Sequence, residues 1–348
     1  MRWTEEKANE WRQSIGRVIG CNYLPATAVN STEMWQKDTF DPETIKKELM
    51  LAASTGYNSV RVFLQFIVWE AERESFMKNF EDFLKIADLS GISVMPVLFD
   101  DCAFAEKEPY LGKQDDPKHG VHNSGWTPSP GPAIADDPSK QEELRAYVTD
   151  IVGTFKDDRR IIVWDLYNEP CNSKRGEKSL PLLKNAFKWA REANPRQPLT
   201  TGLWNIVGDY EFPAHEYIFA ELSDVISYHD YLPLGQSVDR HGVLKKYNRP
   251  LFCTEWMYRP GNNTFESHLP FFMEENAGIY NWGLVAGKTQ TNLYNGETVC
   301  DKQAGIHGDA AEPHPVVWQH DIFYPDFTPY SEAEIAILRQ CAQRKEHV

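Results

Sequence analysis

Two glutamates stand at the ends of apolar segments that have the composition of β-strands. Glu169 lies in IIVWDLYNEP at 161–170, and Glu255 lies in PLFCTEW at 250–256. Two facing carboxyl groups can hydrolyse a glycosidic bond, because one protonates the leaving oxygen while the other attacks the anomeric carbon. The acid needs a raised pKa, which burial beside a second carboxylate supplies. Glu169 and Glu255 are therefore the candidate catalytic pair.

The elements that must position this pair follow from an alternation of short apolar segments with amphipathic ones, which is typical of βα units and a parallel sheet. The predicted strands cover residues 17–22, 59–65, 93–100, 161–170, 198–204, 224–231, 250–256 and 277–285. Eight strands, each followed by a helix or a helix-sized segment, predict an α/β protein with a (β/α)8 TIM barrel. Glu169 and Glu255 then belong to strands four and seven, so their carboxyl groups can face each other across the mouth of the barrel.

Local signals mark the ends of several helices. Asp41 followed by Pro42 predicts the start of the helix after strand one, and Gly56 predicts its end. Ser331 and Glu334 have the spacing of a capping box for the closing helix of the chain.

Two long segments interrupt the alternation, at 101–136 after strand three and at about 286–330 after strand eight. Long loops in a compact domain are usually functional, and loops that follow barrel strands face the active site. No linker or internal repeat divides the sequence, so residues 1–348 are expected to form a single catalytic domain.

The strand ends also give a specific resemblance. The NEP motif on strand four and the TEW motif on strand seven resemble clan A of the glycoside hydrolases, especially the cellulase-like family 5. Other landmarks fall in order over nearly the whole chain. They are Arg61 on strand two, Asn168 beside the first glutamate, His229 and Tyr231 in an H-x-Y motif on strand six, and Trp282 on strand eight.

The resemblance implies a role for each of these residues. Glu169 would be the acid/base and Glu255 the nucleophile, with Arg61 supporting the nucleophile. Asn168 would bind the sugar 2-hydroxyl. His229 and Tyr231 would lie beside the two glutamates, and Trp282 would form an aromatic platform under the sugar.

The sequence departs from the family pattern at the end of strand three, where family 5 members usually carry a histidine. Asp100 and Asp101 stand there instead, and both are candidate substrate-binding residues. The HNSGW motif in the following loop can return over the site, which makes His122, Asn123 and Trp126 further candidates.

Composition limits the partners of the protein. The formal net charge of −15 disfavours binding to nucleic acid and to anionic membranes. Neither an apolar N-terminal segment nor a membrane-length apolar stretch is present, which predicts a cytoplasmic protein. No cofactor or metal is expected. Four cysteines near strand ends could form a four-thiol metal site, but buried inert thiols are the preferred interpretation: Cys21, Cys102, Cys171 and Cys253.

The sequence therefore predicts a retaining β-glycoside hydrolase that acts on β-linked oligosaccharides, with exo action favoured because long loops can close one end of the site. Three alternatives remain open. They are an endo-acting mannanase, xylanase or glucanase, a carbohydrate-binding barrel without turnover, and a metal-dependent barrel hydrolase or isomerase. Neither the sugar nor the oligomeric state follows from the sequence.

Overall fold

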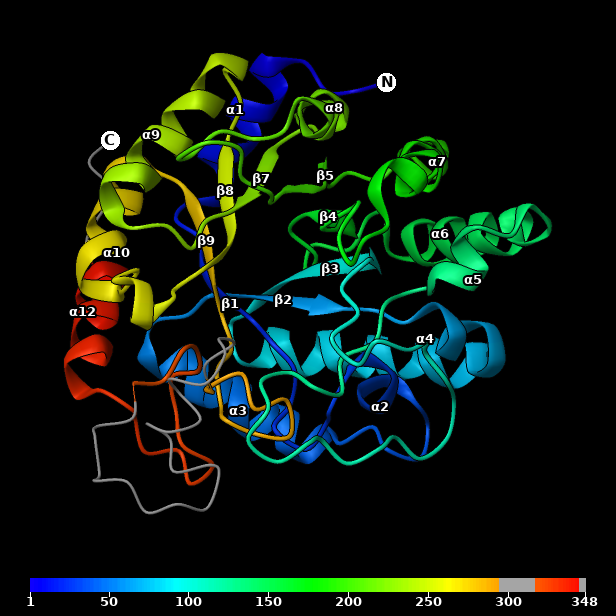
Figure 1. Cartoon of the computed structure of the whole chain (residues 1–348), viewed down its shortest axis with the longest axis horizontal. Coiled ribbons are helices and arrows are strands. Elements are labelled where there is room, and N and C mark those ends of the chain that lie inside the picture. Colours follow the sequence, from blue (N-terminus) through cyan, green and yellow to red (C-terminus); the bar gives the residue numbers. More distant parts are fainter. Residues whose placement is uncertain (294–316, 344–348) are drawn as a thin grey trace.

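The computed structural model describes residues 1–293 and 317–343. Its parallel strands form one sheet in the order β5-β4-β3-β2-β1-β9-β8-β7-β6, which curls into a nearly closed barrel (Figure 1). The strands are β1 (Ile19–Asn22), β2 (Ser59–Phe63), β3 (Ser93–Asp100), β4 (Trp164–Asn168), β5 (Leu199–Thr200), β6 (Gly202–Leu203), β7 (Ile226–His229), β8 (Leu251–Trp256) and β9 (Gly278–Trp282). The predicted TIM barrel is confirmed, and each predicted strand overlaps an observed one.

The predicted fifth strand differs from the structure, because it is divided into β5 and β6. Thr200 of β5 pairs with Asp165 of β4, whereas Gly202 of β6 pairs with Ser227 of β7. Between them, the Thr201 hydroxyl donates to the carbonyl of Tyr167 at 2.6 Å. The barrel therefore closes at this seam partly through side-chain hydrogen bonds.

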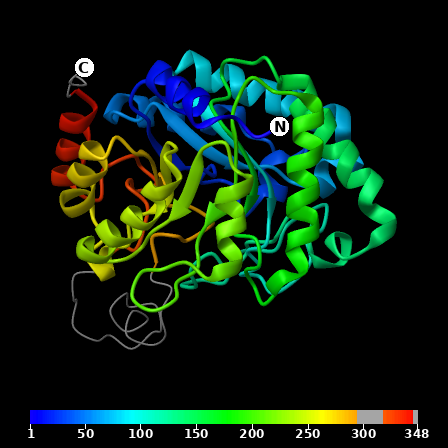
Figure 2. The same ribbon diagram turned by 90° about the horizontal axis from the view of Figure 1, so that it is seen from above.

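Helices surround the barrel, as the view from above shows (Figure 2). The α-helices before β4 are α1 (Glu5–Ile15), α2 (Ser31–Trp35), α3 (Pro42–Thr55), α4 (Phe66–Leu89), α5 (Pro132–Ala135) and α6 (Gln141–Phe155). Those after it are α7 (Leu180–Ala193), α8 (Tyr217–Leu222), α9 (Leu234–Leu244), α10 (Phe265–Glu274) and α12 (Glu332–Gln343). No helix in the described ranges is both long and apolar enough to cross a membrane.

The predicted ends of α3 are confirmed. The side chain of Asp41 accepts a hydrogen bond from the backbone N–H of Thr44, and Pro42 is the first helical residue. Gly56 ends the helix with φ 111°, a left-handed conformation that glycine adopts at little cost. At α12, the N–H of Glu334 donates to Ser331 Oγ at 3.3 Å, while the Glu334 carboxylate forms an ion pair with Arg259.

Helix α1 covers the amino end of the barrel. Trp11 and Ile15 of this helix pack against a small apolar cluster formed where the strands begin, which includes Met95, Val163 and Phe252. The active sites of such barrels lie at the opposite end, where the strands reach their carboxyl ends.

The two long loops lie at that carboxyl end. The first runs from the end of β3 to α5 and includes the His122–Trp126 motif. The second follows β9, and its residues 294–316, with Cys300 among them, lie outside the described residues.

Candidate active site

A cavity of about 290 Å³ opens at the carboxyl ends of the strands. Eight of its described lining residues were predicted from the sequence: His122, Asn123, Trp126, Asn168, Glu169, Tyr231, Glu255 and Trp282. Six others were not: Phe63, Cys102, Phe104, Tyr258, Gln319 and His320. The remaining predicted residues are not among the described lining residues. Arg61 and His229 lie against the two glutamates, whereas Asp100 and Asp101 accept hydrogen bonds from other side chains.

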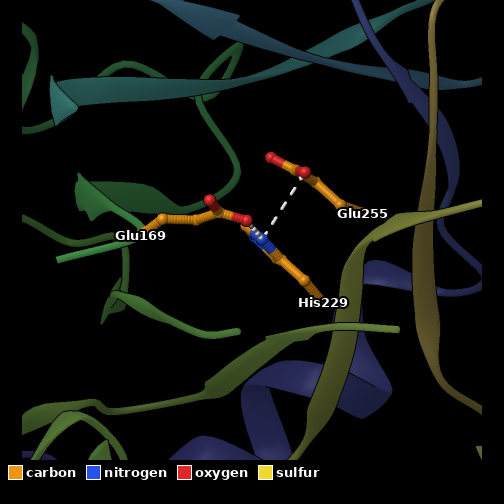
Figure 3. A group of neighbouring side chains, drawn as sticks. All are labelled: Glu169, His229 and Glu255. Carbon is orange, nitrogen blue, oxygen red and sulfur yellow. Dashed lines mark hydrogen bonds and ion pairs between the residues drawn. The ribbon is translucent and has the colours of Figure 1, made fainter. Parts of the chain in front are cut away.

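The two glutamates point toward each other, and His229 reaches both (Figure 3). His229 Nδ1 lies 2.6 Å from Glu169 Oε1 and 3.5 Å from Glu255 Oε2. One oxygen of each carboxyl group and one nitrogen of His229 all lie within 4.8 Å of one another. This separation suits a pair that acts on two bonded atoms of one substrate.

Glu169 directly follows β4 and has a left-handed backbone with φ 43°. Its Oε2 accepts hydrogen bonds from the Asn172 side-chain amide and, at 3.1 Å, from the thiol of Cys102. Burial raises the pKa of Glu169 above its usual value, and these two hydrogen bonds oppose the shift. A carboxyl group in such surroundings can hold a proton near neutral pH, as a general acid must.

Glu255, on β8, has a different set of partners. Its Oε1 accepts from Arg61 Nη1 at 3.0 Å, and its Oε2 accepts from the Tyr231 hydroxyl at 2.9 Å. Burial raises the pKa of Glu255, while the Arg61 charge and the Tyr231 hydroxyl favour the ionised form. A permanent cation faces Glu255 at hydrogen-bond distance, whereas neutral donors hold Glu169, so the two carboxyl groups have different environments.

Arg61 is fully buried and ties four strand ends together. Its guanidinium donates to Asn22 at 2.7 Å, to Asn168 at 2.6 Å and to Asp165 at 3.0 Å, besides its bond to Glu255. The planar fork of arginine can serve several acceptors in fixed directions, which an ammonium group cannot do. The guanidinium therefore sets both the charge and the orientation of the Glu255 side chain.

His229 is neutral at ordinary pH, because burial lowers its pKa to about 3. Its Nε2 has no hydrogen-bond partner among the described residues and is buried against Gly202, where an added Cβ would lie 2.9 Å from this nitrogen. An unpaired acceptor costs less than an unpaired donor, so the proton belongs on Nδ1. His229 then donates to Glu169 Oε1.

Asp100 and Asp101 hold protein groups in place. Asp100 accepts from Asn168 Nδ2 at 2.8 Å and from the Trp126 indole at 2.7 Å, and burial raises its pKa to about 7. Asp101 accepts from the Tyr167 hydroxyl at 2.7 Å and from the N–H of Cys171 at 2.9 Å. Their carboxylate oxygens thus accept hydrogen bonds from protein groups, and neither aspartate is among the described residues that line the cavity.

Aromatic side chains form one wall of the cavity. The Trp282 ring at the end of β9 stacks with Phe63 at a centroid distance of 6.1 Å, and Trp126 meets it edge-on at 5.7 Å. His320 also stacks on Trp282, at 6.4 Å. Such flat apolar faces suit the C–H side of a pyranose ring.

Hydrogen bonds from the two long loops hold further lining residues in place. The Asn123 N–H donates to the Thr289 carbonyl at 2.8 Å, and His122 Nδ1 binds the Leu293 carbonyl at 2.7 Å. His320 Nδ1 binds the Met257 carbonyl at 2.7 Å. Since each histidine uses Nδ1–H toward a backbone carbonyl, its Nε2 is an acceptor, and in His320 it accepts from the Gln319 side-chain amide at 3.0 Å.

Some of the unpredicted lining residues had a signal in the sequence. Phe63 lies two residues after Arg61 on one strand, and the two-residue period of a strand places them on the same face. Cys102 stands just beyond β3, where barrel active sites are built. Gln319 and His320 carry no comparable signal, because only the return of the chain after β9 brings them to the cavity.

In the part of the chain that the structure describes, the cysteines form no group that could hold a metal ion. The thiols near the strand ends are free, and burial raises the pKa of each: Cys21, Cys102, Cys171 and Cys253. Within the described ranges, the residues close enough to hold a metal ion together are Glu169, His229 and Glu255. Arg61 already occupies one oxygen of this group, and its charge opposes a second cation.

A TIM barrel whose carboxyl end holds two facing glutamates beside aromatic side chains defines a glycoside hydrolase. The chain belongs to glycosyl hydrolase family 5, because the model of the family Cellulase matches residues 20–295. It is thus a β-glycoside hydrolase, an enzyme that cleaves O-glycosyl bonds. No curated protein matches the chain.

Several solved structures share the fold at low sequence identity. GH5_18 from Streptomyces cattleya, in complex with GlcNAc, has a TM-score of 0.59 at 12% identity, with 95% of this chain and 81% of that chain covered. The exo-β-1,4-mannosidase Op5Man5 from Opitutaceae bacterium strain TAV5 has a TM-score of 0.59 at 17% identity, covering 94% and 60%. The endo-β-1,4-mannanase from Thermotoga petrophila has a TM-score of 0.55 at 14% identity, covering 94% and 76%.

Proposed function

We propose that residues 1–348 form a retaining, exo-acting β-glycosidase that takes neutral β-linked oligosaccharides. The observation that carries the proposal is the approach of one oxygen of each carboxyl group to within 4.8 Å of the other, with His229 between them. Retaining enzymes hold their carboxyl groups about 5–5.5 Å apart, whereas inverting enzymes leave about 6.5–9.5 Å for a water molecule. The short separation favours direct attack on the sugar by one carboxylate.

The roles follow from the two environments. Glu255, whose ionised form Arg61 favours, attacks the anomeric carbon and forms a glycosyl ester as the bond to the leaving oxygen breaks. Glu169, with its raised pKa, gives its proton to that leaving oxygen. In the second step Glu169 takes a proton from water, whose oxygen attacks the same carbon and releases Glu255.

The shape of the cavity supports exo action on a short substrate. Its volume of about 290 Å³ lies at the lower end of the range for small-molecule sites, roughly 300–1,000 Å³. The loop that carries His122 and Asn123 is joined by hydrogen bonds to residues 289–293, which closes one side of the cavity. A cavity closed in this way accepts the end of a chain more readily than its middle.

The lining also favours an uncharged sugar. None of the described lining residues is a lysine or an arginine, and two of them are carboxyl groups. A uronic acid would bring a third carboxylate beside Glu169 and Glu255 without a cation to face it. The names of the structural relatives make β-mannosides the first neutral sugars to test.

The test begins with a panel of nitrophenyl β- and α-glycosides without added metal, using the wild type, Glu255→Ala and Glu169→Ala. We expect one β-glycoside to be hydrolysed by the wild type and by neither variant at a comparable rate. Azide should rescue both variants. It should yield an α-glycosyl azide with Glu255→Ala, because azide replaces the nucleophile, and a β-glycosyl azide with Glu169→Ala.

Two further measurements complete the test. NMR of the first-formed sugar should show the β-anomer, whereas initial release of the α-anomer would refute retention. Product lengths on a β-linked polymer distinguish the modes of action. Release of one small sugar supports exo action, while a ladder of oligosaccharides would establish the endo alternative. Full activity of Glu255→Ala would refute the mechanism.

A further inference from the structure

The thiol of Cys102 lies inside the cavity and touches the proposed acid/base. Cys102 Sγ lies 3.1 Å from Glu169 Oε2, 3.4 Å from Asn172 Nδ2 and 3.5 Å from Asn168 Nδ2. The two amide nitrogens can only donate, so they donate to the sulfur, while the thiol hydrogen is directed to Glu169. The other oxygen, Glu169 Oε1, is held by His229.

The double displacement places an unusual demand on the partners of Glu169, which must be protonated in one step and ionised in the next. A thiol can satisfy both states, because sulfur is a weak donor and a weak acceptor. When Glu169 is ionised, S–H donates to Oε2. When Oε2 carries the proton, O–H donates to sulfur after the thiol hydrogen turns away. The amide nitrogen of Asn172, the other partner of Oε2, can only donate, so it cannot accept a hydrogen bond from the protonated oxygen.

We propose that Cys102 is a positioning residue that holds Oε2 of Glu169 in place through both protonation states of the reaction. This inference rests on the proposed role of Glu169 as acid/base. The thiol itself stays protonated, since burial raises the pKa of Cys102 well above its usual value and the nearby carboxylates add to the shift. It therefore does not compete with Glu255 as a nucleophile.

Other groups also act on the pKa of Glu169, and they remain unchanged when Cys102 alone is replaced. The titratable and charged groups that contact Glu169 or interact with it electrostatically are Arg61, Asp100, Glu216, His229, Tyr231 and Glu255. A shift in the titration of Glu169 after replacement of Cys102 thus reports the lost contact.

The experiment compares pH profiles of kcat/KM for the wild type, Cys102→Ala and Cys102→Ser. The substrate should be a β-linked disaccharide, because its poor leaving group needs the acid. Removing a donor to the carboxylate raises the pKa of Glu169, so the basic limb of Cys102→Ala should move up by about half a pH unit. A hydroxyl is a stronger donor, so the basic limb of Cys102→Ser should move down.

Cys341→Ala is the matched control, since this buried thiol lies on α12 away from the cavity, and its profile should coincide with that of the wild type.

Opposite shifts in the two Cys102 variants would support the inference. Coincident profiles, or shifts in the same direction, would overturn it and leave the proposed function intact. Undiminished disaccharide hydrolysis by Glu169→Ala would instead refute the proposed function. If Cys102→Ala fails to fold, the direction of the Cys102→Ser shift alone decides the question.

Discussion

Substitutions of Arg61 can separate the contribution of this side chain to the stability of the fold from its contribution to catalysis. Arg61→Met keeps most of the apolar stem but removes the guanidinium, which leaves Asp165 buried without its cation. Breaking a buried ion pair by removing one partner costs about 3–5 kcal/mol. We expect the free energy of unfolding to fall by that amount and the melting temperature by roughly 5–15 °C.

The same change affects Glu255, which loses a charged hydrogen bond of 3.0 Å. A nearby cation lowers the pKa of a carboxyl group by about 1–3 units, so removing Arg61 should raise the pKa of Glu255 by a similar amount. Because Glu255 must be ionised to attack, the acidic limb of the kcat/KM profile should move to higher pH. The loss of a hydrogen bond to a charged group, about 1.5–3 kcal/mol, should lower kcat/KM about 10- to 150-fold.

The double variant Arg61→Met/Asp165→Asn separates the two effects. Replacing Asp165 removes the orphaned charge, so thermal unfolding should recover part of the lost stability. Glu255 remains without its cation, so kcat/KM and the acidic limb should stay at the values of the single variant. Recovery of activity together with stability would refute the catalytic role of Arg61, and so would an acidic limb at the wild-type position in either variant.

Three further predictions concern His229, metal and substrate charge. Gly202→Ala should lower kcat/KM about 100-fold, because the new Cβ would push against His229 Nε2. Gly153→Ala is the control, since its new Cβ enters open space and should leave kcat/KM unchanged. Equal activity of the two variants would contradict the assigned place of His229. Activity should survive prolonged EDTA treatment, and a loss that zinc restores would point to a metal enzyme. A nitrophenyl β-glucuronide should be cleaved at least about 100-fold more slowly than the best neutral β-glycoside, because its carboxylate would face Glu169 and Glu255. Comparable rates would overturn the preference for neutral sugars.

Much of the barrel could be predicted because its strands are short apolar segments between helices with clear end signals. The division of the fifth strand could not, because it depends on which neighbour each residue pairs with. Thr200 finds its partner on β4 and Gly202 finds its partner on β7, and neither partner is apparent from the local sequence.

Part of the site could be predicted for the same reason. Glu169, Glu255 and Trp282 sit at strand ends, where the barrel fold itself brings side chains together. The two aspartates after β3 have the right position, but the donors that occupy their oxygens come from β4 and the loops, which the sequence does not place. His320 reaches the cavity through a loop whose path depends on packing against Met257 and Trp282.

The hydrogen bonds of Arg61 join strands of the barrel, whereas other lining residues of the cavity, such as His122, Asn123 and Gln319, lie in loops. Arg61 links β1, β2, β4 and β8, and none of these bonds involves the residues that close the cavity. Natural selection can therefore change which sugar is accepted without rebuilding the chemistry. For protein engineering, a library restricted to His122, Asn123 and Gln319 should yield many folded, active enzymes with altered sugar preference.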